Sequence, residues 1–530
     1  MLRSLRVVLA AFVLIGIGFL GGHALERTFG WGPAPDTYDK LRAAIEIADR
    51  QYVDSLGVDA LSQEALRGLF SGLDPHSSYI DRERMQRVRE SFDAEFDGIG
   101  VTYERIGRAD VPDTVMVVSV VPDGPSDKAG LRAGDRLVAV DETSLVGLPD
   151  ERVQALLKGP RGTTVHVSVH RPHQPTPLTL SITRDRIPLN TVDATYMIDE
   201  RTGYIKLNRF ARTTHTEVRD ALESLTEQGM ERLVLDLRGN AGGLMNMAER
   251  VADEFLLSGQ LVVSARGRGG AILDEYRTSR SGAFENGPMM VLVDRHSASA
   301  SEIVAGALQD HQRALMIGER TYGKGLVQRQ YDLGDGSGVR LTVARFYTPS
   351  GRVIQQPYDT GSAVMRTIAN GADTSNADDA PGGISPDHRI ESDTLYQVAQ
   401  RFAQHLAVRD YMRSWIDRHT SSLENAWKGR PEAFLETYTV PDSVVTRLGA
   451  DLRSASTRRA EQAVRDYDHL TDTVRGTILL RNSLTGMIAR RVFGIEGWIR
   501  VENRMDPAMQ ATHHLWNHAT DRAQAYAHRF

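Results

Sequence analysis

The chain has 530 residues, 41% of them hydrophobic, with a formal net charge of −6 and a pI near 6.3. This length and apolar content support several compact units with real hydrophobic cores. The acidic balance and the lack of a basic stripe argue against a nucleic-acid partner. The absence of cysteine excludes disulfides, thiolate metal sites, a cysteine nucleophile and a cysteine-linked lipoprotein anchor.

Residues 1–30 contain an uncharged apolar run, Val7 to Gly22, that follows Arg3 and Arg6. As a helix this run would reach about 24 Å, slightly less than the ~30 Å hydrocarbon core of a bilayer. It is also long for the apolar part of a signal peptide. Both a cleaved signal peptide and a retained one-span membrane anchor fit, and we favour the anchor. With the positively charged end inside, the rest of the chain is expected to be extracytoplasmic, in the periplasm of a cell envelope, and held at the inner membrane.

Residues 36–95 have a helical pattern between Tyr38 and Arg89, with apolar residues at helix spacing. The segment LDPHSSYID (Leu73 to Asp81) interrupts this pattern. We interpret His76 as a structural turn residue, because nothing near it in the sequence completes a set of metal ligands.

Residues 96–185 contain FDGIGVTY followed by GPSDKAGLRAGDRLVAVD (Gly124 to Asp141). Together these segments resemble a PDZ domain, a small β-rich barrel that binds an extended peptide as an added strand. The resemblance implies that the turn of Gly98, Ile99, Gly100 and Val101 holds the peptide's terminal carboxylate. The resemblance also implies that Lys158 stands where related chains often have an arginine that links occupancy of the PDZ domain to a site elsewhere in the chain.

Residues 190–390 alternate between strand-like and helix-like segments, which predicts an α/β core with a largely buried sheet. A polar stretch from Asp359 to Pro381 interrupts the alternation and is interpreted as a surface insertion.

Ser299 lies within this core, in HSASASEIVAGALQD, after the apolar segment Met289 to Val293 and at the start of a helical segment. Lys324 follows in TYGKGLVQ, between two glycines. A serine hydroxyl needs a base, and lysine serves as one only when burial lowers its pKa from about 10.4. The flanking glycines allow the close backbone approach that such burial needs. The pattern favours a serine nucleophile with a lysine base.

An oxyanion site is also predicted, because the start of a helix presents unpaired N–H groups and a positive dipole end. The Ala300 amide is the natural donor, and Gly242 or Gly243 of LDLRGNAGG would supply the second. Each piece has an ordinary alternative. Serines before a helix often cap it, a lysine between glycines is often solvated, and LDLRGNAGG fits a plain strand-to-helix turn.

The whole set of segments favours the catalytic interpretation. LDLRGNAGG, SASASEIVAGALQD, TYGKGLVQ, ARFYTPSGRVIQ and GGISPD occur in the order and spacing of the carboxy-terminal processing proteases, which this chain resembles over residues 36–390. The resemblance implies a ClpP/crotonase-like α/β core with Ser299 as nucleophile and Lys324 as base. Gln328 would orient the lysine and Asp310 would act as a supporting residue. It also leads us to expect a homodimer through the N-terminal helical region.

Residues 391–530 are helical in pattern and highly charged, with no recognisable chemistry, and we expect a docking or assembly surface there. We therefore expect an ATP-independent serine endopeptidase that selects proteins or peptides by their exposed C-termini. It should need neither a metal nor an organic cofactor. The alternative is a catalytically silent PDZ adaptor that binds C-termini without cleaving them.

Overall fold

The structure is a computed structural model that describes residues 37–55, 57–108, 111–171, 174, 176–357, 382–455 and 458–528. Residue contacts divide the chain into two compact units, the first of Met1–Asp81, Gln330–Leu341 and Thr360–Ile368, the second of the remainder. Residues 1–30 and the predicted insertion at 359–381 lie outside the described ranges. Within those ranges, none of the helices has the length and hydropathy needed to cross a bilayer.

The first unit begins with α2 (Thr37–Gln51) and α3 (Val58–Ser71), as the helical pattern predicts. A turn then leads into β1 (Ser78–Ile80), where the Asp74 carboxylate accepts the amides of His76 and Ser77 at 2.8 Å each. β1 pairs antiparallel with the first residues of β18 (Gly338–Tyr347). His76 therefore lies in a turn whose backbone is held by an aspartate.

The second unit begins with α4 (Arg82–Asp93) and a small β-rich module. Its sheet has the order β3-β4-β5-β7-β8, with β6 paired to β5 and with β2 and β9 forming a separate ribbon. The strands are β2 (Glu95–Gly98), β3 (Val101–Arg108), β4 (Val111–Val120), β5 (Arg136–Val140), β6 (Thr143–Ser144), β7 (Thr164–His170), β8 (Leu178–Thr183) and β9 (Asp185–Pro188). The helices α5 (Pro125–Lys128) and α6 (Asp150–Leu157) complete it around a closed apolar cluster.

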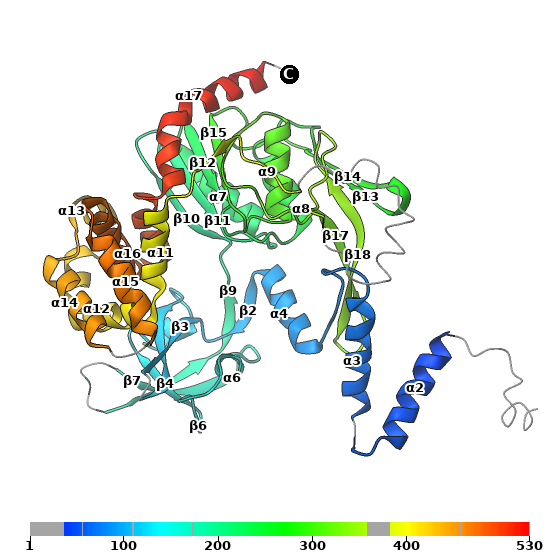
Figure 1. The fold of residues 1–530 in the computed structure, drawn as a ribbon, viewed down its shortest axis with the longest axis horizontal. Helices are drawn as coiled ribbons and strands as arrows, with labels where there is room; N and C mark the ends of the chain where they lie inside the picture. The colour runs from blue at the N-terminus through cyan, green and yellow to red at the C-terminus, as the bar shows by residue number, and fades with distance from the viewer. Residues whose placement is uncertain are drawn as a thin grey trace, which may run out of the picture. The chain divides into compact units, whose positions relative to one another are not determined.

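A six-stranded sheet in the order β10-β11-β12-β15-β16-β19 forms the centre of the second unit (Figure 1). Its strands are β10 (Val192–Met197), β11 (Thr202–Leu207), β12 (Arg232–Asp236), β15 (Met289–Val293), β16 (Leu315–Gly318) and β19 (His388–Arg389). All neighbouring pairs are parallel except β10 with β11. Strand β15 is buried at every position, as expected for a parallel strand covered on both faces.

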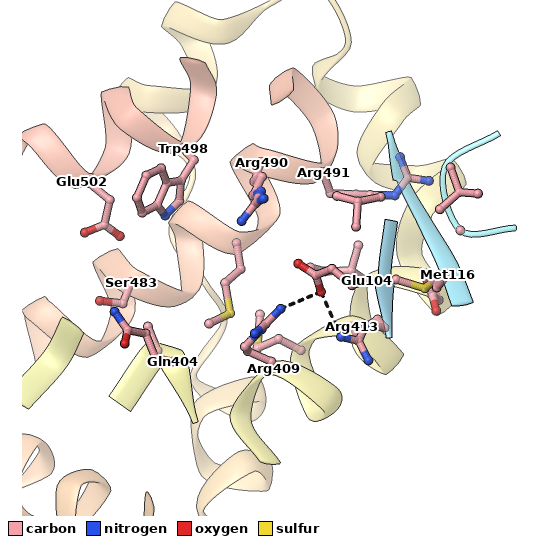
Figure 2. A pocket seen from close by; sticks show the side chains of 18 of the residues that line it. Glu104, Met116, Gln404, Arg409, Arg413, Ser483, Arg490, Arg491, Trp498 and Glu502 are labelled. Carbon is pink, nitrogen blue, oxygen red and sulfur yellow. Dashed lines mark hydrogen bonds and ion pairs between the residues drawn. The ribbon is translucent and has the colours of Figure 1, made fainter. Parts of the chain in front are cut away.

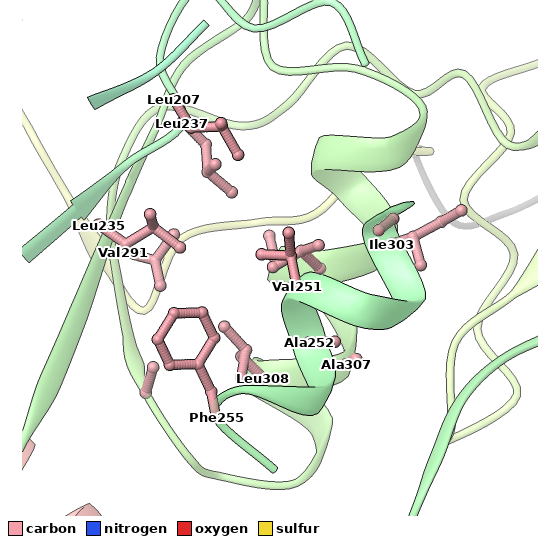
Figure 3. Packing of buried hydrophobic residues seen from close by; sticks show 14 of the residues in the cluster. Leu207, Leu235, Leu237, Val251, Ala252, Phe255, Val291, Ile303, Ala307 and Leu308 are labelled. Atoms are coloured by element: carbon pink, nitrogen blue, oxygen red, sulfur yellow. The ribbon is translucent and has the colours of Figure 1, made fainter. Parts of the chain in front are cut away.

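Alternate residues of these strands enter two different cores. One face packs against α7 (Thr214–Glu227), α8 (Met245–Asp253) and α9 (Ala300–Asp310), and Figure 3 shows side chains from α8, α9 and the sheet meeting in this cluster. The opposite face packs against the end of α16 and against α17 (Pro507–Ala527). The predicted α/β core is confirmed, with one helical layer supplied by the C-terminal region.

A second, smaller sheet joins β13 (Leu261–Arg266) and β14 (Ile272–Arg277) to the end of β18. Strand β17 (Leu326–Asp332) pairs with β18. The long connection between β16 and β17 carries residues 321–325, which include Lys324.

The C-terminal region is helical, as predicted. It comprises α11 (Thr394–Gln404), α12 (Leu406–Trp427), α13 (Pro431–Thr437), α14 (Asp442–Ser454), α15 (Arg458–Thr471), α16 (Val474–Asn503) and α17. Helices α11 to α16 have an apolar core of their own. Gly494 breaks the helical backbone of α16 with φ 75° and ψ −158°.

Candidate active site

Ser299 occupies the junction between the six-stranded sheet and α9. It directly precedes the helix and has φ 55° and ψ −113°, a conformation that costs a side-chain-bearing residue roughly 1–3 kcal/mol. Such strain is found where a side chain must be presented at a sharp strand-to-helix turn. The structure therefore places Ser299 where the sequence pattern predicted it.

The Ala300 amide lies at the first turn of α9. It makes no hydrogen bond within the described part of the chain, whereas the next two amides bond back to the turn: that of Ser301 to Ala298 and that of Glu302 to Ser299. Because α9 has 11 residues, its aligned peptide dipoles add a partial positive charge at this end. An oxyanion beside Ser299 would find a donor there.

Glu302, in the first turn of α9, joins the two segments that carry Ser299 and Lys324. It is 0% exposed, and its Oε2 accepts the backbone N–H of Ser299 and that of Lys324, each at 2.8 Å. Its Oε1 accepts the Thr321 hydroxyl and the Gly323 amide, each at 2.6 Å. One carboxylate thus holds residues 25 positions apart in the sequence within a single hydrogen-bond network.

Burial raises the pKa of Glu302, and the four donors oppose that rise. The net direction is upward from the ordinary glutamate value. Protonation would remove acceptor capacity from one oxygen, and with it part of the link between the two segments.

The glycines around Lys324 have the close packing that the sequence analysis expected. A Cβ on Gly323 would lie 2.7 Å from the Cβ of Gln356, and one on Gly325 would lie 2.5 Å from the Gln355 amide nitrogen. Lys324 itself is half-buried. The backbone here passes too close to residues 354–356 for any larger residue, which fixes the course of the lysine-bearing segment.

The two glycines predicted as oxyanion donors have different neighbours. A Cβ on Gly242 would lie 2.7 Å from the Ala298 carbonyl oxygen, 2.8 Å from Ser299 Cβ and 2.9 Å from the Ala300 nitrogen. Gly243 instead packs against the backbone of Phe210. Gly242 is therefore the glycine in contact with the Ser299 turn, and its N–H donates to the side-chain oxygen of Asn240 at 2.9 Å.

The glycine turn is tied to the Ser299 turn by buried polar contacts. The Asn240 carbonyl accepts the Ala298 amide at 3.0 Å and the Ser301 hydroxyl at 2.8 Å, one on each side of Ser299. The Ser297 hydroxyl donates to the Leu237 carbonyl at 2.9 Å. The serines beside Ser299 thus bind the neighbouring loop instead of capping α9.

Two other residues predicted for the site, Gln328 and Asp310, lie on different elements. Gln328 is half-buried on β17, four residues after Lys324. Asp310 ends α9, where its carboxylate accepts the Ser350 amide at 2.9 Å and pairs with Arg352. Asp310 therefore orders residues 348–352 at the far end of the helix from Ser299.

Comparison with known proteins places the chain in a family. The sequence profile of peptidase family S41 matches residues 201–362, and a PDZ domain profile matches residues 116–171. A carboxy-terminal-processing protease of Bartonella bacilliformis is 37% identical over 329 residues, which cover 60% of this chain and 74% of that protein. This chain belongs to the carboxy-terminal processing proteases.

Other similar proteins bear related names. The protease CtpA of Bacillus subtilis is 34% identical over 320 residues, covering 60% of this chain and 67% of that protein. A solved structure of a photosystem II D1 C-terminal processing protease is 31% identical, covers 67% of this chain and 93% of that one, and has a TM-score of 0.35. The two sequence profiles and the similar proteases of Bartonella bacilliformis and Bacillus subtilis identify the chain as a serine peptidase with a PDZ domain.

The PDZ domain of this protease has a groove of about 300 Å³ between β3 and α6. Ile99, Gly100 and Val101 line it, and Gly98 ends β2 just before them. The Ile99 carbonyl accepts both the amide and the hydroxyl of Ser126, which turns it away from the groove. The turn predicted to hold a carboxylate therefore borders the groove.

Lys158 lies at the mouth of this groove. Its ammonium is 2.5 Å from Glu90 of α4 and 4.5 Å from the centre of the Phe96 ring. The cation lies beside the turn that was predicted to hold a carboxylate, and its side chain is held by an acidic partner and an aromatic ring.

A second pocket of about 360 Å³ lies between strands β3 and β4 of the PDZ domain and helices α11, α12 and α16 of the C-terminal region (Figure 2). At one side Glu104 forms ion pairs with Arg409 at 2.8 Å and Arg413 at 3.1 Å. Burial alone would raise the pKa of Glu104, but the two guanidinium groups hold it below its usual value. These ion pairs join the PDZ domain to the C-terminal region.

A third cleft of about 770 Å³ includes Gly239, Ala241 and Gly242 of the glycine turn, together with Thr102 and Ser119 of the PDZ sheet. The cleft therefore extends from the PDZ sheet to the glycine turn, and Gly242 of that turn packs against the Ser299 turn.

The sequence analysis did not identify Glu302 as part of the site. It also did not identify the buried polar contacts of residues 237–240, which follow β12. A glutamate three residues after a serine matches a capping box, which needs no further partner. The signal that could have identified Glu302 is its position among apolar residues at the start of the helix, because a buried carboxylate needs hydrogen-bond donors.

Proposed function

We propose that this protease is an ATP-independent serine endopeptidase of the cell envelope that uses Ser299 and Lys324 as a catalytic dyad. In this proposal it selects substrates by their C-terminal residues through the PDZ groove. The observation that carries the proposal is the shared acceptor: one oxygen of Glu302 binds the amides of Ser299 and Lys324. These two hydrogen bonds keep the backbones of Ser299 and Lys324 close together, which supports a contact between the serine hydroxyl and the lysine amine.

In the proposed mechanism the neutral Lys324 amine takes the Ser299 proton as Oγ attacks the scissile carbonyl carbon. The Ala300 amide and the Gly242 turn hold the oxyanion, the Gly242 N–H being shared with Asn240. The C–N bond then breaks, and the Lys324 ammonium returns its proton to the leaving amine. A water attacks the acyl-enzyme with Lys324 again as base, which releases the carboxylate product and restores the serine. Gln328 would orient the lysine.

For substrate selection, the peptide's last residues would add as a strand along β3. The carboxylate would lie at the turn from Gly98 to Val101, within reach of Lys158. The apolar residues of the groove would accept the terminal side chain. The strand-like mode of binding suits an unfolded tail, since a folded terminus lacks free backbone groups.

The test uses purified protein without residues 1–30 and a quenched fluorogenic polypeptide that has no stable fold and ends in apolar residues. We expect cleavage by the unmutated protein without ATP, and loss of at least 1,000-fold in kcat in Ser299→Ala and Lys324→Ala, as for removal of a catalytic nucleophile or base. Binding without cleavage by the unmutated protein would instead identify a silent PDZ adaptor.

The location and assembly are also part of the proposal. The apolar run of residues 7–22 supports a membrane anchor with the enzyme on the extracytoplasmic side. Membrane fractionation with and without residues 1–30 tests this, and recovery of both forms in the soluble fraction would refute it. The family resemblance suggests a homodimer through α2 and α3, which analytical ultracentrifugation of chains with and without residues 37–71 would test.

A further inference from the structure

A buried charged cluster lies at the end of β12, directly before the glycine turn. The Asp236 carboxylate is 1% exposed and accepts the Tyr204 hydroxyl at 2.8 Å, the Lys206 ammonium at 3.1 Å and the Arg238 guanidinium at 2.6 Å. Burial alone would raise the pKa of Asp236, but Arg238 and Lys206 hold it well below its usual value. The two cations therefore favour the ionised form of Asp236.

Within this cluster, two cations face one carboxylate. Lys206 and Arg238 both contact Asp236, and Asp193 on β10 is also close enough to Lys206 to interact with its charge. The two cations are partly exposed, with 17% of the Lys206 side chain and 20% of the Arg238 side chain open to solvent. Arg238 pairs with a second carboxylate as well, one from the C-terminal region.

Asp506 of the C-terminal region supplies that charge. Its Oδ2 is 2.8 Å from Arg238 Nη1, a contact between residues 268 positions apart in the sequence. Asp506 is the N-cap of α17, where its Oδ1 accepts the Met509 amide at 3.0 Å, and the Tyr396 hydroxyl donates to its Oδ2 at 3.1 Å. The carboxylate is thus held by its own helix and by α11.

Helix α17 is a rigid support for this contact. Its apolar side packs on β15 and β16, and near its other end the Tyr526 hydroxyl donates to Gln260 at 2.7 Å in the core. Arg522 adds a bond to the Ala314 carbonyl at 3.0 Å. The position of Asp506 is therefore fixed relative to the six-stranded sheet that bears Ser299.

Arg238 transmits this position to the active site through the backbone. It is followed by Gly239, whose amide donates to Asp294 at 2.9 Å, and by Asn240, whose carbonyl accepts the Ala298 amide and the Ser301 hydroxyl. A change in the direction of Arg238 would shift this turn and the donor groups beside Ser299. Displacements of about 1 Å at a reacting centre can cost ~100-fold in rate.

We propose that Asp506 is a positioning residue for catalysis: it fixes Arg238, and through Arg238 the oxyanion turn at residues 239–242. The C-terminal region is thereby part of the active-site architecture and more than a docking surface. This inference rests on the proposed function, because it assigns Asp506 to the oxyanion site of the Ser299 mechanism.

The test is Asp506→Asn, which keeps a side-chain oxygen for capping α17 but removes the charge that faces Arg238. The matched control is Asp393→Asn. Asp393 is likewise an N-cap, of α11, where it accepts the Tyr396 amide, and it likewise pairs with an arginine, the exposed Arg475. In the described part of the chain it has no hydrogen bond or ion pair to Arg238 or to residues 239–242, so its substitution removes a capping charge without removing one that faces Arg238. Both variants should retain their helices, and both are assayed at a temperature at which circular dichroism shows them folded.

With the fluorogenic polypeptide, we expect Asp506→Asn to lower kcat about ten-fold, short of the ~100-fold cost of a full 1 Å misplacement, with KM nearly unchanged. Its affinity for a peptide boronic acid, which forms a tetrahedral anion on a nucleophilic serine, should fall by a similar factor. Asp393→Asn should match the unmutated protein in both measurements.

A kcat of Asp506→Asn equal to that of Asp393→Asn would overturn the inference. So would a loss of rate that only follows the folded fraction measured by circular dichroism. If the unmutated protein neither cleaves the polypeptide nor binds the boronic acid, the proposed function fails and this inference fails with it. Cleavage by the unmutated protein together with full activity in Asp506→Asn would refute this inference alone.

Discussion

The backbone amides of Ser299 and Lys324 donate to the same oxygen of the buried Glu302 carboxylate, each at 2.8 Å. The two nitrogens therefore lie no further apart than the sum of these two bonds. This relationship explains how the segments that carry Ser299 and Lys324, which a helix and a strand separate in the sequence, are held next to each other. It also makes the ionisation of one glutamate a condition for the geometry.

Through protonation of Glu302, acidification should lower the activity and raise the stability of the protein. The pKa of Glu302 is raised in the folded protein. At pH values between the ordinary glutamate pKa and the raised one, the folded protein therefore keeps a proton on Glu302 that the unfolded chain has released. Stability from this group is therefore present at low pH and falls as pH rises through that window. Activity should do the reverse, since protonation weakens the link from Ser299 to Lys324.

Urea unfolding and cleavage rates measured from pH 4 to 8 test this prediction. In Glu302→Gln the stability trend should vanish and kcat should be at least ten-fold lower at every pH, because an amide supplies one oxygen where the carboxylate supplies two. Wild-type stability and activity that rise together across the window would contradict the prediction.

Gly242→Ala should abolish cleavage, whereas Gly239→Ala should retain most of it. Both glycines have positive φ, 95° and 71°, so both substitutions introduce backbone strain of roughly 1–2 kcal/mol. Only the Cβ at 242 would clash, with Ala298, Ser299 and Ala300, while nothing lies within 4 Å of the one at 239. Steady-state kinetics should show a loss of more than about 100-fold in kcat for Gly242→Ala alone. Equal losses in both variants would mean that strain, not the contact, decides.

Lys158→Ala should raise KM about ten-fold for a substrate with a free C-terminal carboxylate, with little change in kcat. The reason is the loss of a charge-assisted hydrogen bond, worth about 1.5–3 kcal/mol. Arg161→Ala is the control, because Arg161 belongs to the same domain but is exposed and pairs with Asp185 outside the groove. A substrate with an amidated C-terminus should bind both variants equally. If Lys158→Ala raises the KM of the amidated substrate as much as that of the substrate with a free carboxylate, Lys158 does not contact the carboxylate.

Glu104→Gln should weaken the attachment of the PDZ domain to the C-terminal region by about 1 kcal/mol, the usual magnitude for a partly exposed ion pair. Because the two arginines lower the pKa of Glu104 in the folded protein, its contribution is present at neutral pH and disappears as the carboxylate becomes protonated on acidification. Denaturation of the variant and of the unmutated protein should therefore differ at pH 7 and converge as the pH is lowered through that range. A difference that persists unchanged in acid would mean that Glu104 acts by packing alone.

Much of the fold was predictable because it depends on local pattern. Continuous apolar runs such as Met289 to Val293 mark buried parallel strands, and the small residues around Ser299 mark a sharp turn before a helix. The glycines beside Lys324 indicated close packing, which the structure confirms. In each case the physical cause lies within a few residues of the signal.

The rest was not predictable because its causes are non-local. Glu302 resembles an ordinary capping residue until the donors at residues 321–324 are brought to it by tertiary folding. The choice between Gly242 and Gly243 depends on which faces the Ser299 turn, and both occupy one short motif. Asp506 followed by proline is a readable helix start, but its pairing with Arg238 joins residues 268 positions apart.

Covalent labelling of the serine tests the central claim most directly. The protein is treated with a fluorophosphonate across pH 6 to 10, and the modified peptide is identified by mass spectrometry in the unmutated protein, Ser299→Ala and Lys324→Ala. We predict a single adduct on Ser299, absent from Ser299→Ala and formed at least 100-fold more slowly in Lys324→Ala. Labelling of a different serine, or labelling of Ser299 at an undiminished rate without Lys324, would contradict the proposed dyad.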